Sequence, residues 1–362
     1  MSIYSSLEKD VSLNSSKEDV LREIENVVER YYVKNEENTN PGIVILDDQV
    51  SEKIYRTALN REVCVDCMEK LIIKYNGVYR KLGTGRGLVG ATAAVSWKGV
   101  KHTYELISYK YPHPVQINKK VKNEIANIAE KYSSTFNNLE KDENVISLFP
   151  KERTPVIYGI RSKNSENLRK IQMEIGKLYP EYNENFLIYK TNQGTDDHII
   201  PFKGGQLQDL SSYLLTGRIV KAPSRNVGGH LHFSMSVNGE VCNCIVFEPS
   251  KKFRNNVESL RVNDFIQAYG SFGNESLKIE KIRVLEFSEI YERKTPKCKN
   301  CGTNMRNVGN RKFKCRKCET ISDPVFVKVD RSKKQKMMEP PVYARRHLSM
   351  PWKLEGEALD EP

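Results

Sequence analysis

Apolar residues recur at helical spacing in several stretches of the chain. Residues 16–33 place Val20, Ile24 and Val27 on one helical face, and Ser16 precedes them as a candidate N-cap. The same rhythm predicts a long helix from Ser51 to the turn at Asn76-Gly77, and further helices over residues 118–132 and 164–179.

Strand-like runs surround the last two of these helices. They lie at residues 102–111, 134–140, 155–162 and 185–191, and the run at 134–140 has the weakest pattern. The resulting order, βαββαβ, is typical of a ferredoxin-like arrangement. We therefore predict a ferredoxin-like domain over residues 100–200.

A second group of alternating runs follows without predicted helices of comparable length. These runs cover residues 211–220, 229–237, 240–248, 264–272 and 276–287, with glycine-containing turns between some of them. Such a series is typical of an OB-fold barrel, here predicted over residues 206–290. Another small barrel without a ligand fits the same pattern. The predicted fold class is thus α+β with several domains.

The composition predicts a soluble protein, and its charge predicts a polyanionic partner. The chain has 362 residues, of which 38% are hydrophobic, and it shows no apolar run of the length that crosses a membrane. The first residues carry no apolar signal core, so we expect a cytoplasmic protein without a membrane partner. Residues 291–336 hold 15 lysines and arginines against 4 acids, which accounts for most of the net charge of +12. This excess favours a nucleic acid partner.

The basic segment contains two Cys-x-x-Cys pairs. Cys298 with Cys301, and Cys315 with Cys318, have the spacing of a zinc ribbon, predicted over residues 291–330 with one structural zinc ion. Disulfides or redox cysteines are the alternative. The cations around the pairs are candidate contacts to RNA phosphates: Lys299, Arg306, Arg311, Lys312, Lys314, Arg316 and Lys317.

The other four cysteines are expected to pack in the interior. Cys64 and Cys67 also have Cys-x-x-Cys spacing, but they fall in the helix predicted after Ser51, which favours buried thiols over a second metal site. Cys242 and Cys244 alternate in a predicted strand and therefore share one face.

Two polar motifs are suited to chemistry. "GTGRGLVGATAAV" (residues 83–95) combines glycines with a small-residue helix, a pattern that presents backbone N–H groups to phosphate. Close helix packing explains its glycines equally well. "KTNQGTDDHI" (residues 190–199) gathers side chains that would bind a nucleotide, a metal ion or RNA, or would simply cap a polar turn.

The C-terminal segment, residues 331–362, is predicted to be a strapping tail and not a domain. Its Arg345 and Arg346 are candidate phosphate contacts. Such a pair of arginines is more often simply exposed to solvent.

Several segments in chain order resemble a known family. They are "GRGLVGATAAVSW", "HTYELISYK", "PVIYGIRS", "TNQGTDDH", "GGHLHFSM", "FEPSKKFRNNVESLRVNDFI", the two cysteine pairs and "PPVYARRHLSMPW". Together they resemble the archaeal tRNA-Ile 2-agmatinylcytidine synthetases, from about Asn40 to Trp352.

The resemblance implies an activity and its partners. Members of this family use ATP, with Mg²⁺, to activate C2 of the wobble cytidine in the CAU anticodon of an isoleucine tRNA, and agmatine then replaces the oxygen. It also implies a kinase-like domain, here a partial ATP-binding domain over residues 1–99, before the ferredoxin-like domain. The residues implied to lie near ATP are Gly85, Arg86, Gly87, Gly90, Thr191, Asn192, Gln193, Gly194, Thr195 and Asp196.

One departure from the family pattern affects the catalytic residues. The family's aspartate-rich Gly-Ile-Asp-Asp-Thr-Asp-Ser segment does not occur in this sequence. Because carboxylates hold Mg²⁺ against phosphates, no catalytic residue is assigned. A longer enzyme, a separate polypeptide that supplies this segment, and a non-catalytic tRNA-binding relative all remain open.

Overall fold

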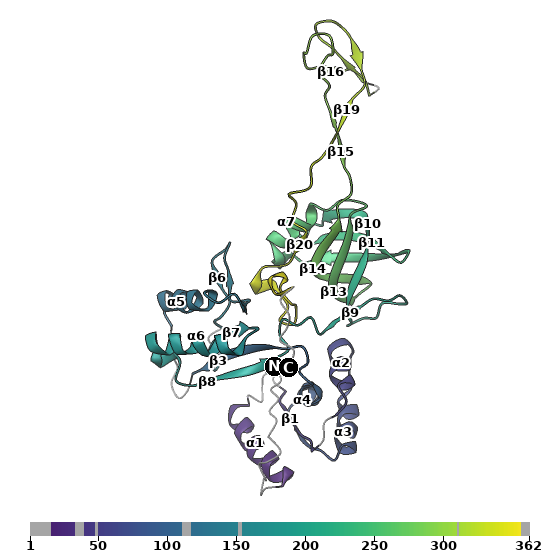
Figure 1. The fold of residues 1–362 in the computed structure, drawn as a ribbon. Helices are drawn as coiled ribbons and strands as arrows, with labels where there is room; N and C mark the ends of the chain where they lie inside the picture. Colours follow the sequence, from purple (N-terminus) through teal and green to yellow (C-terminus); the bar gives the residue numbers. More distant parts are fainter. Residues whose placement is uncertain are drawn as a thin grey trace.

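A computed structural model of the chain describes residues 16–32, 40–47, 50–110, 117–150, 154–309 and 311–355. In chain order it contains a small α/β unit, a helix-covered four-stranded sheet, a closed barrel and a projecting ribbon (Figure 1). Among the helices of these residues, none combines the length and apolar character needed to cross a membrane.

The N-terminal unit packs helices around a two-stranded sheet. Helix α1 (Lys17–Tyr31) begins at the predicted N-cap, because Ser16 accepts the N–H of Asp19 while the Asp19 carboxylate accepts the N–H of Ser16. Strand β1 (Gly42–Ile45) pairs antiparallel with β2 (Val78–Lys81), and α4 (Arg86–Ser96) packs against β1.

The prediction of one long helix after Ser51 is wrong, because the chain forms two helices there. Helix α2 (Lys53–Asn60) ends where Arg61 becomes extended, and α3 (Val65–Lys74) begins after Cys64. The break has a tertiary cause: the Asn60 carbonyl accepts the hydroxyl of Ser211, at the start of the barrel, at 2.8 Å. A continuing helix would need that carbonyl for its own next turn.

The four-stranded sheet has the chain order predicted for it. Its strands are β3 (Thr103–Tyr109), β4 (Thr135–Phe136), β7 (Val156–Ser162) and β8 (Phe186–Thr191), arranged β4-β7-β3-β8 and all antiparallel. Helices α5 (Lys119–Glu130) and α6 (Ser165–Leu178) cover one face (Figure 1). The strand predicted over residues 134–140 is short, because Asn137 has a positive φ of 55° and the chain turns into a hairpin of β5 (Leu139–Glu140) and β6 (Val145–Ile146). Tyr111, predicted to end the first strand, lies outside the described residues.

The predicted barrel is present and closes on itself. Strands β10 (Ser212–Arg225), β11 (Leu231–Val237), β12 (Glu240–Val246), β13 (Phe265–Gly273) and β14 (Ser276–Glu286) follow one another as β11-β12-β14-β13-β10, and β10 pairs again with β11. Helix α7 (Lys252–Glu258) connects β12 to β13. Cys242 and Cys244 lie inside the barrel core, as predicted from their alternation.

A two-stranded stalk carries the cysteine ribbon away from the barrel. Strands β15 (Tyr291–Lys294) and β19 (Val325–Lys328) form the stalk, and the ribbon beyond it contains β16 (Arg306–Asn307), β17 (Phe313–Lys314) and β18 (Ile321–Ser322) (Figure 1).

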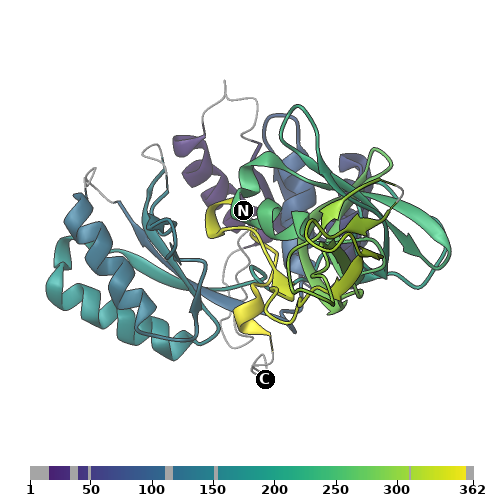
Figure 2. The ribbon, with the colours of Figure 1, turned by 90° about the horizontal axis from the view of Figure 1, so that it is seen from above.

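Residues 331–355, called the C-terminal strap below, connect the barrel to the four-stranded unit. Arg331 is buried and holds both carboxylate oxygens of Asp264, at 2.6 and 2.7 Å. Strand β20 (Met337–Met338) then joins β14, and the Leu354 carbonyl accepts the Lys163 ammonium of the four-stranded unit at 3.1 Å. Figure 2 shows the strap, in yellow, between the two units. Residues 356–362 of the predicted tail lie outside the described residues.

A buried cation joins the strap, the barrel and the segment that leaves the four-stranded sheet. Lys281 of β14 is 1% exposed, and its Nζ lies 2.5 Å from Asp196 Oδ2 and 2.7 Å from the Met350 carbonyl. The Tyr269 and Trp352 rings lie 4.8 and 4.6 Å from the same ammonium. Asp196 also accepts the Met350 N–H at 2.7 Å. Because each polar group here has its partner in another segment, the contacts fix the relative position of all three.

We predict that Asp196→Asn destabilises the protein by about 3 kcal/mol, because it leaves the Lys281 charge buried without its counter-ion. Urea denaturation followed by tryptophan fluorescence measures the change. The matched control is Glu289→Gln, which removes the partner of Lys328 in an exposed pair and is expected to leave the free energy of unfolding nearly unchanged. Equal losses in the two variants would contradict a special role for the buried pair.

Candidate functional site

The four predicted metal ligands converge at the tip of the ribbon. Each pair sits on a tight turn: the Cys298 N–H bonds to the Thr303 carbonyl and the Cys315 N–H to the Thr320 carbonyl, both at 2.9 Å. Gly302 follows the first pair with a φ of 71°, a conformation that glycine adopts without steric cost.

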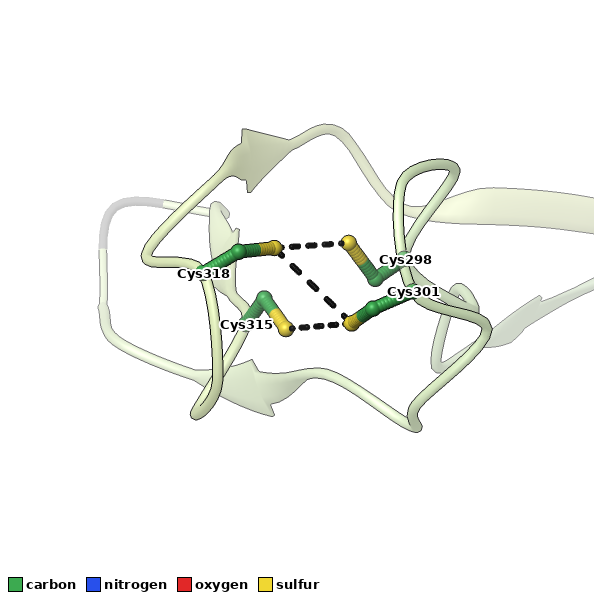
Figure 3. A group of neighbouring side chains, drawn as sticks. All are labelled: Cys298, Cys301, Cys315 and Cys318. Carbon is green, nitrogen blue, oxygen red and sulfur yellow. Dashed lines mark hydrogen bonds between the residues drawn. The ribbon is translucent and has the colours of Figure 1, made fainter.

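The sulfur atoms have the spacing of a tetrahedral metal site (Figure 3). Sγ of Cys318 lies 3.3 Å from Sγ of Cys298 and 3.8 Å from Sγ of Cys301, which is 3.4 Å from Sγ of Cys315. All four ligand atoms lie within 4.8 Å of one another. A tetrahedral tetrathiolate with metal–sulfur bonds of about 2.3 Å places its sulfurs about 3.8 Å apart, so this cluster fits one metal ion.

Threonine hydroxyls next to the cluster favour thiolates. Hydrogen bonds from the Thr303 hydroxyl and backbone lower the pKa of Cys301 to about 6. The Thr320 hydroxyl lowers the pKa of Cys318 in the same way. Since the thiolate is the form that binds metal, these threonines prepare the exposed sulfur of each pair for coordination.

Most of the predicted phosphate contacts are exposed around this cluster. Lys312 pairs with Asp323 at 2.7 Å and the partly buried Lys314 pairs with Glu319 at 3.0 Å. The remaining five side chains belong to exposed residues: Lys299, Arg306, Arg311, Arg316 and Lys317.

Arg345 and Arg346 differ from the ribbon cations in their surroundings. The Arg345 side chain is only 7% exposed and bonds to Glu339, Asn137 and the Pro340 carbonyl, so it braces the strap against the β4–β5 turn. Arg346 is 40% exposed and pairs with Glu280 at 3.0 Å. Arg345 is therefore too deeply buried to meet a phosphate in this arrangement.

The glycine-rich motif forms the N-terminus of α4. Gly85 is the N-cap in the left-handed conformation, with a φ of 76°, and Arg86 after it is exposed. A Cβ on Gly87 would come within 1.9 Å of the Asn40 carbonyl oxygen, so close packing against the chain before β1 requires this glycine. The turn is held by Asn40, whose side chain accepts the Thr84 N–H at 2.7 Å.

The Thr191–Asp196 run lies in the junction between units. Gln193 bonds to both members of an ion pair on β3 and β7, at 2.6 Å to Glu105 and 2.6 Å to Arg161. Thr191 bonds to Thr103, Thr195 bonds back to the Asn192 carbonyl, and the Gly194 N–H bonds to the strap at His347. Asp196 holds Lys281 as described above. The polar groups of this run thus already have protein partners.

The Thr191–Asp196 run is linked to the C-terminal end of α4 through Tyr55. Its C-cap, Trp97, has its ring 6.3 Å from that of Tyr55, and the Tyr55 hydroxyl contacts Asn192 at 2.9 Å and Asp197 at 3.1 Å. Burial raises the pKa of both Tyr55 and Asp197. A helix of 11 residues is about 16 Å long, so the Gly85 N-cap and the Trp97 C-cap lie about that far apart.

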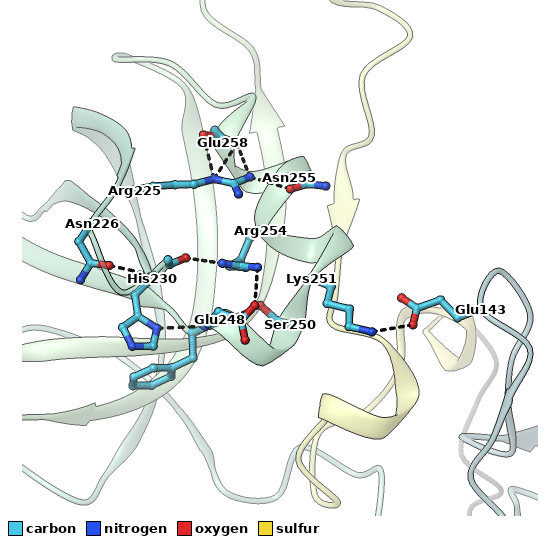
Figure 4. A network of polar contacts seen from close by, with 12 residues as sticks. Glu143, Arg225, Asn226, His230, Glu248, Ser250, Lys251, Arg254, Asn255 and Glu258 are labelled. Atoms are coloured by element: carbon cyan, nitrogen blue, oxygen red, sulfur yellow. Dashed lines mark hydrogen bonds and ion pairs between the residues drawn. The ribbon is translucent and has the colours of Figure 1, made fainter.

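Sequence reasoning missed a second contact between the barrel and the four-stranded unit (Figure 4). Lys251 of the barrel pairs with Glu143 after β5 at 3.2 Å. Beside it the Arg254 side chain is 9% exposed, pairs with Glu248 at 3.0 Å and donates to the Gly229 carbonyl. The "FEPSKKFRNNV" run carries these cations, but nothing in its local pattern separates them from a solvated helix face.

We predict that the chain binds about one metal ion and that Cys315→Ser abolishes this binding, because three sulfurs cannot close the tetrahedral site. Elemental analysis of the purified protein measures it. Cys67→Ser is the matched control, since it changes an exposed residue outside the ribbon and should leave the metal content unchanged. Full occupancy in the Cys315→Ser protein would rule out the cluster as the metal site.

Comparison with known proteins identifies the family. The TiaS TCKD domain model matches residues 2–83 and the TiaS FLD domain model matches residues 85–198. The chain is 37% identical over 340 residues to the tRNA-Ile 2-agmatinylcytidine synthetase TiaS of Thermoplasma volcanium, covering 94% of this chain and 78% of the relative.

Solved structures of TiaS have the same fold. The complex of TiaS with its isoleucine tRNA and ATP superposes with a TM-score of 0.79 at 30% identity, over 96% of this chain and 83% of the other. The complex of TiaS with the same tRNA, AMPCPP and agmatine superposes with a TM-score of 0.77 at 28% identity. This superposition covers 96% of this chain and 84% of the other. The chain therefore belongs to the family of tRNA-Ile 2-agmatinylcytidine synthetases, TiaS.

Proposed function

We propose that this chain catalyses the reaction of its family: ATP-dependent attachment of agmatine to C2 of the wobble cytidine in the CAU anticodon of isoleucine tRNA. The observation that carries the proposal is the likeness, over nearly the whole chain, to a TiaS bound to isoleucine tRNA and ATP. A separate structure holds the tRNA, AMPCPP and agmatine together, which are the kinds of reactant that the reaction needs.

The observed elements and the family models support the following division into domains. Residues 1–99 form the kinase-like, ATP-binding part, and residues 100–200 the ferredoxin-like domain around the β4-β7-β3-β8 sheet. The closed barrel is the OB-fold of residues 206–290, and its parallel β12–β14 pair with a helix between β12 and β13 supports that assignment. Residues 291–330 are the zinc ribbon, with Zn²⁺ as the preferred ion for four cysteine thiolates.

For ATP we propose the N-terminus of α4 as the phosphate-binding part of the site. Gly85, Arg86, Gly87 and Gly90 lie in its first turns, where backbone N–H groups, the helix dipole and one exposed guanidinium favour an anion. The run from Thr191 to Asp196 lies at the other end of α4 and is engaged in the junction, so it would position domains around the nucleotide. Mg²⁺ would accompany the phosphates.

For tRNA we propose the ribbon and one face of the stalk. In the β15–β19 pair, Tyr291 stands opposite Lys328 and Arg293 opposite Phe326, so these four residues share a face. Tyr291 is 54% and Phe326 61% exposed. Exposed aromatic rings interleaved with cations form a stacking surface for unpaired bases and neutralise the phosphates beside them.

Labelled agmatine tests the reaction. With ATP and a transcript of the CAU-anticodon isoleucine tRNA, we expect incorporation that disappears without ATP or when the wobble cytidine is replaced by uridine. The match of the TCKD model to residues 2–83 supports activity in the chain itself. Incorporation only after a second, aspartate-rich polypeptide is added would indicate a split enzyme. Tight tRNA binding without incorporation under either condition would favour the non-catalytic, RNA-binding alternative.

The proposed stalk face leads to a separate prediction about tRNA binding. Phe326→Ala should weaken tRNA binding about tenfold with an unchanged salt dependence, because it removes stacking and no charge. Lys317→Gln should instead lower the slope of log K against log salt by about 1. Filter binding across a salt series measures both.

The control lies on the opposite face of the same stalk. Val327→Ala removes another exposed apolar side chain and should leave binding unchanged, and metal content verifies the ribbon fold in every variant. Equal weakening by Phe326→Ala and Val327→Ala would remove the stacking face while leaving the proposed reaction intact.

A further inference from the structure

The Cys64–Cys67 pair is outside the function proposed above, and the structure places it differently from the sequence expectation. The sequence pattern predicts that both residues are buried in a helix, but both are exposed. Their sulfurs are joined in a disulfide, across a Cα–Cα distance of 5.3 Å. That distance lies in the ordinary range for disulfides, so the backbone accommodates the bond in its folded position.

The break between α2 and α3 creates this site. Cys64 is the N-cap of α3, a position usually taken by serine, threonine, aspartate or asparagine, and its Sγ accepts the Cys67 N–H at 3.1 Å. Cys67 follows one turn later on the same helix end. A Cys-x-x-Cys pair at a helix N-terminus is the arrangement in which thiolates are stabilised by backbone N–H groups and the helix dipole. Asp66 in the same turn opposes this effect in part.

We propose that Cys64 and Cys67 form a redox-active dithiol that exchanges with external thiols and disulfides. Small structural disulfides are uncommon in reducing compartments, where an exposed Cys-x-x-Cys pair more often cycles between two states. The pair is separate from the ribbon cysteines, and among the described residues the groups suited to a metal ion are confined to the ribbon cluster.

Reduction by a dithiol compound proceeds through two exchanges. A thiolate of the reductant attacks Sγ of Cys67, the S–S bond breaks, and Cys64 leaves as a thiolate stabilised by the Cys67 N–H. The second thiolate of the reductant then attacks the mixed disulfide and releases Cys67. Two electrons pass to the protein, two protons from the medium complete the thiols, and the reductant becomes a disulfide.

The redox state of Cys64 and Cys67 affects the neighbouring glycine-rich turn, because that turn packs against the start of α3. A Cβ placed on Gly85, the N-cap of α4, would lie 3.2 Å from Val65 Cγ1 and 3.2 Å from Lys81 Cδ. Val65 is the residue directly after Cys64, and Lys81 pairs with Glu69 on α3. The disulfide therefore restrains the helix turn against which the start of α4 is packed.

Thiol trapping in dithiothreitol redox buffers, followed by peptide mapping, tests the exchange. We expect the peptide that holds Cys64 and Cys67 to change from disulfide to doubly alkylated in one reversible two-electron transition. Cys242 and Cys244 are buried and should remain unlabelled throughout, which provides an internal standard. Two free thiols at Cys64 and Cys67 under fully oxidising conditions, or a metal ion that is lost on Cys64→Ser, would overturn the proposal.

Hydrogen exchange of the first turn of α3 gives a readout that is independent of activity. Its amides should exchange at least about tenfold more slowly in the oxidised protein, because the short covalent loop restricts local opening. Cys64→Ser retains an N-cap oxygen and Cys67→Ser retains the Cys64 cap, so both should fold and both should lose the redox dependence. Exchange that responds to dithiothreitol equally in these variants would show that the effect arises elsewhere.

Discussion

The ammonium of Lys281 is the group on which the arrangement of this protein depends. A cation that is 1% exposed is tolerated only when its charge is compensated and its hydrogens find acceptors. Here the compensation comes from Asp196, between the four-stranded sheet and the barrel, and from the strap carbonyl of Met350. Because neither partner belongs to the barrel strand that carries Lys281, satisfying one buried charge aligns the two large units.

The contact between Lys281 and Asp196 changes how the polar run from Thr191 to Asp196 is interpreted. In the sequence it has the composition of a ligand-binding loop. In the structure the Gln193 amide, the Thr191 hydroxyl and the Asp196 carboxylate bind other parts of the chain. The glycine-rich turn at the start of α4 has a buried N-cap, Gly85, and keeps an exposed arginine beside it. The proposed nucleotide contacts are therefore concentrated at one end of that helix, and the proposed domain-positioning contacts at the other.

Local patterns predicted those parts of the fold whose causes are local. Ser16 caps its helix, the barrel strands alternate as expected, and the four ribbon cysteines converge because turn geometry and spacing suffice to bring them together. The break after Asn60 was not predictable, because its cause is a serine 151 positions away. Arg345 was mistaken for a free cation for the same reason, since its partner Asn137 is 208 positions distant. Lys281 and Asp196, 85 positions apart, carry no local sign of their pairing.

The strap also has a consequence for how the protein is made. The ribosome releases the four-stranded unit and the barrel well before Met350 and Trp352, and domains generally fold in the order of their synthesis. Lys281 then has Asp196 as a partner but lacks its second oxygen and one of its flanking rings until the strap emerges. During that interval the nascent units would be tethered loosely, and the lasting docking of one upon the other would wait until the strap emerges.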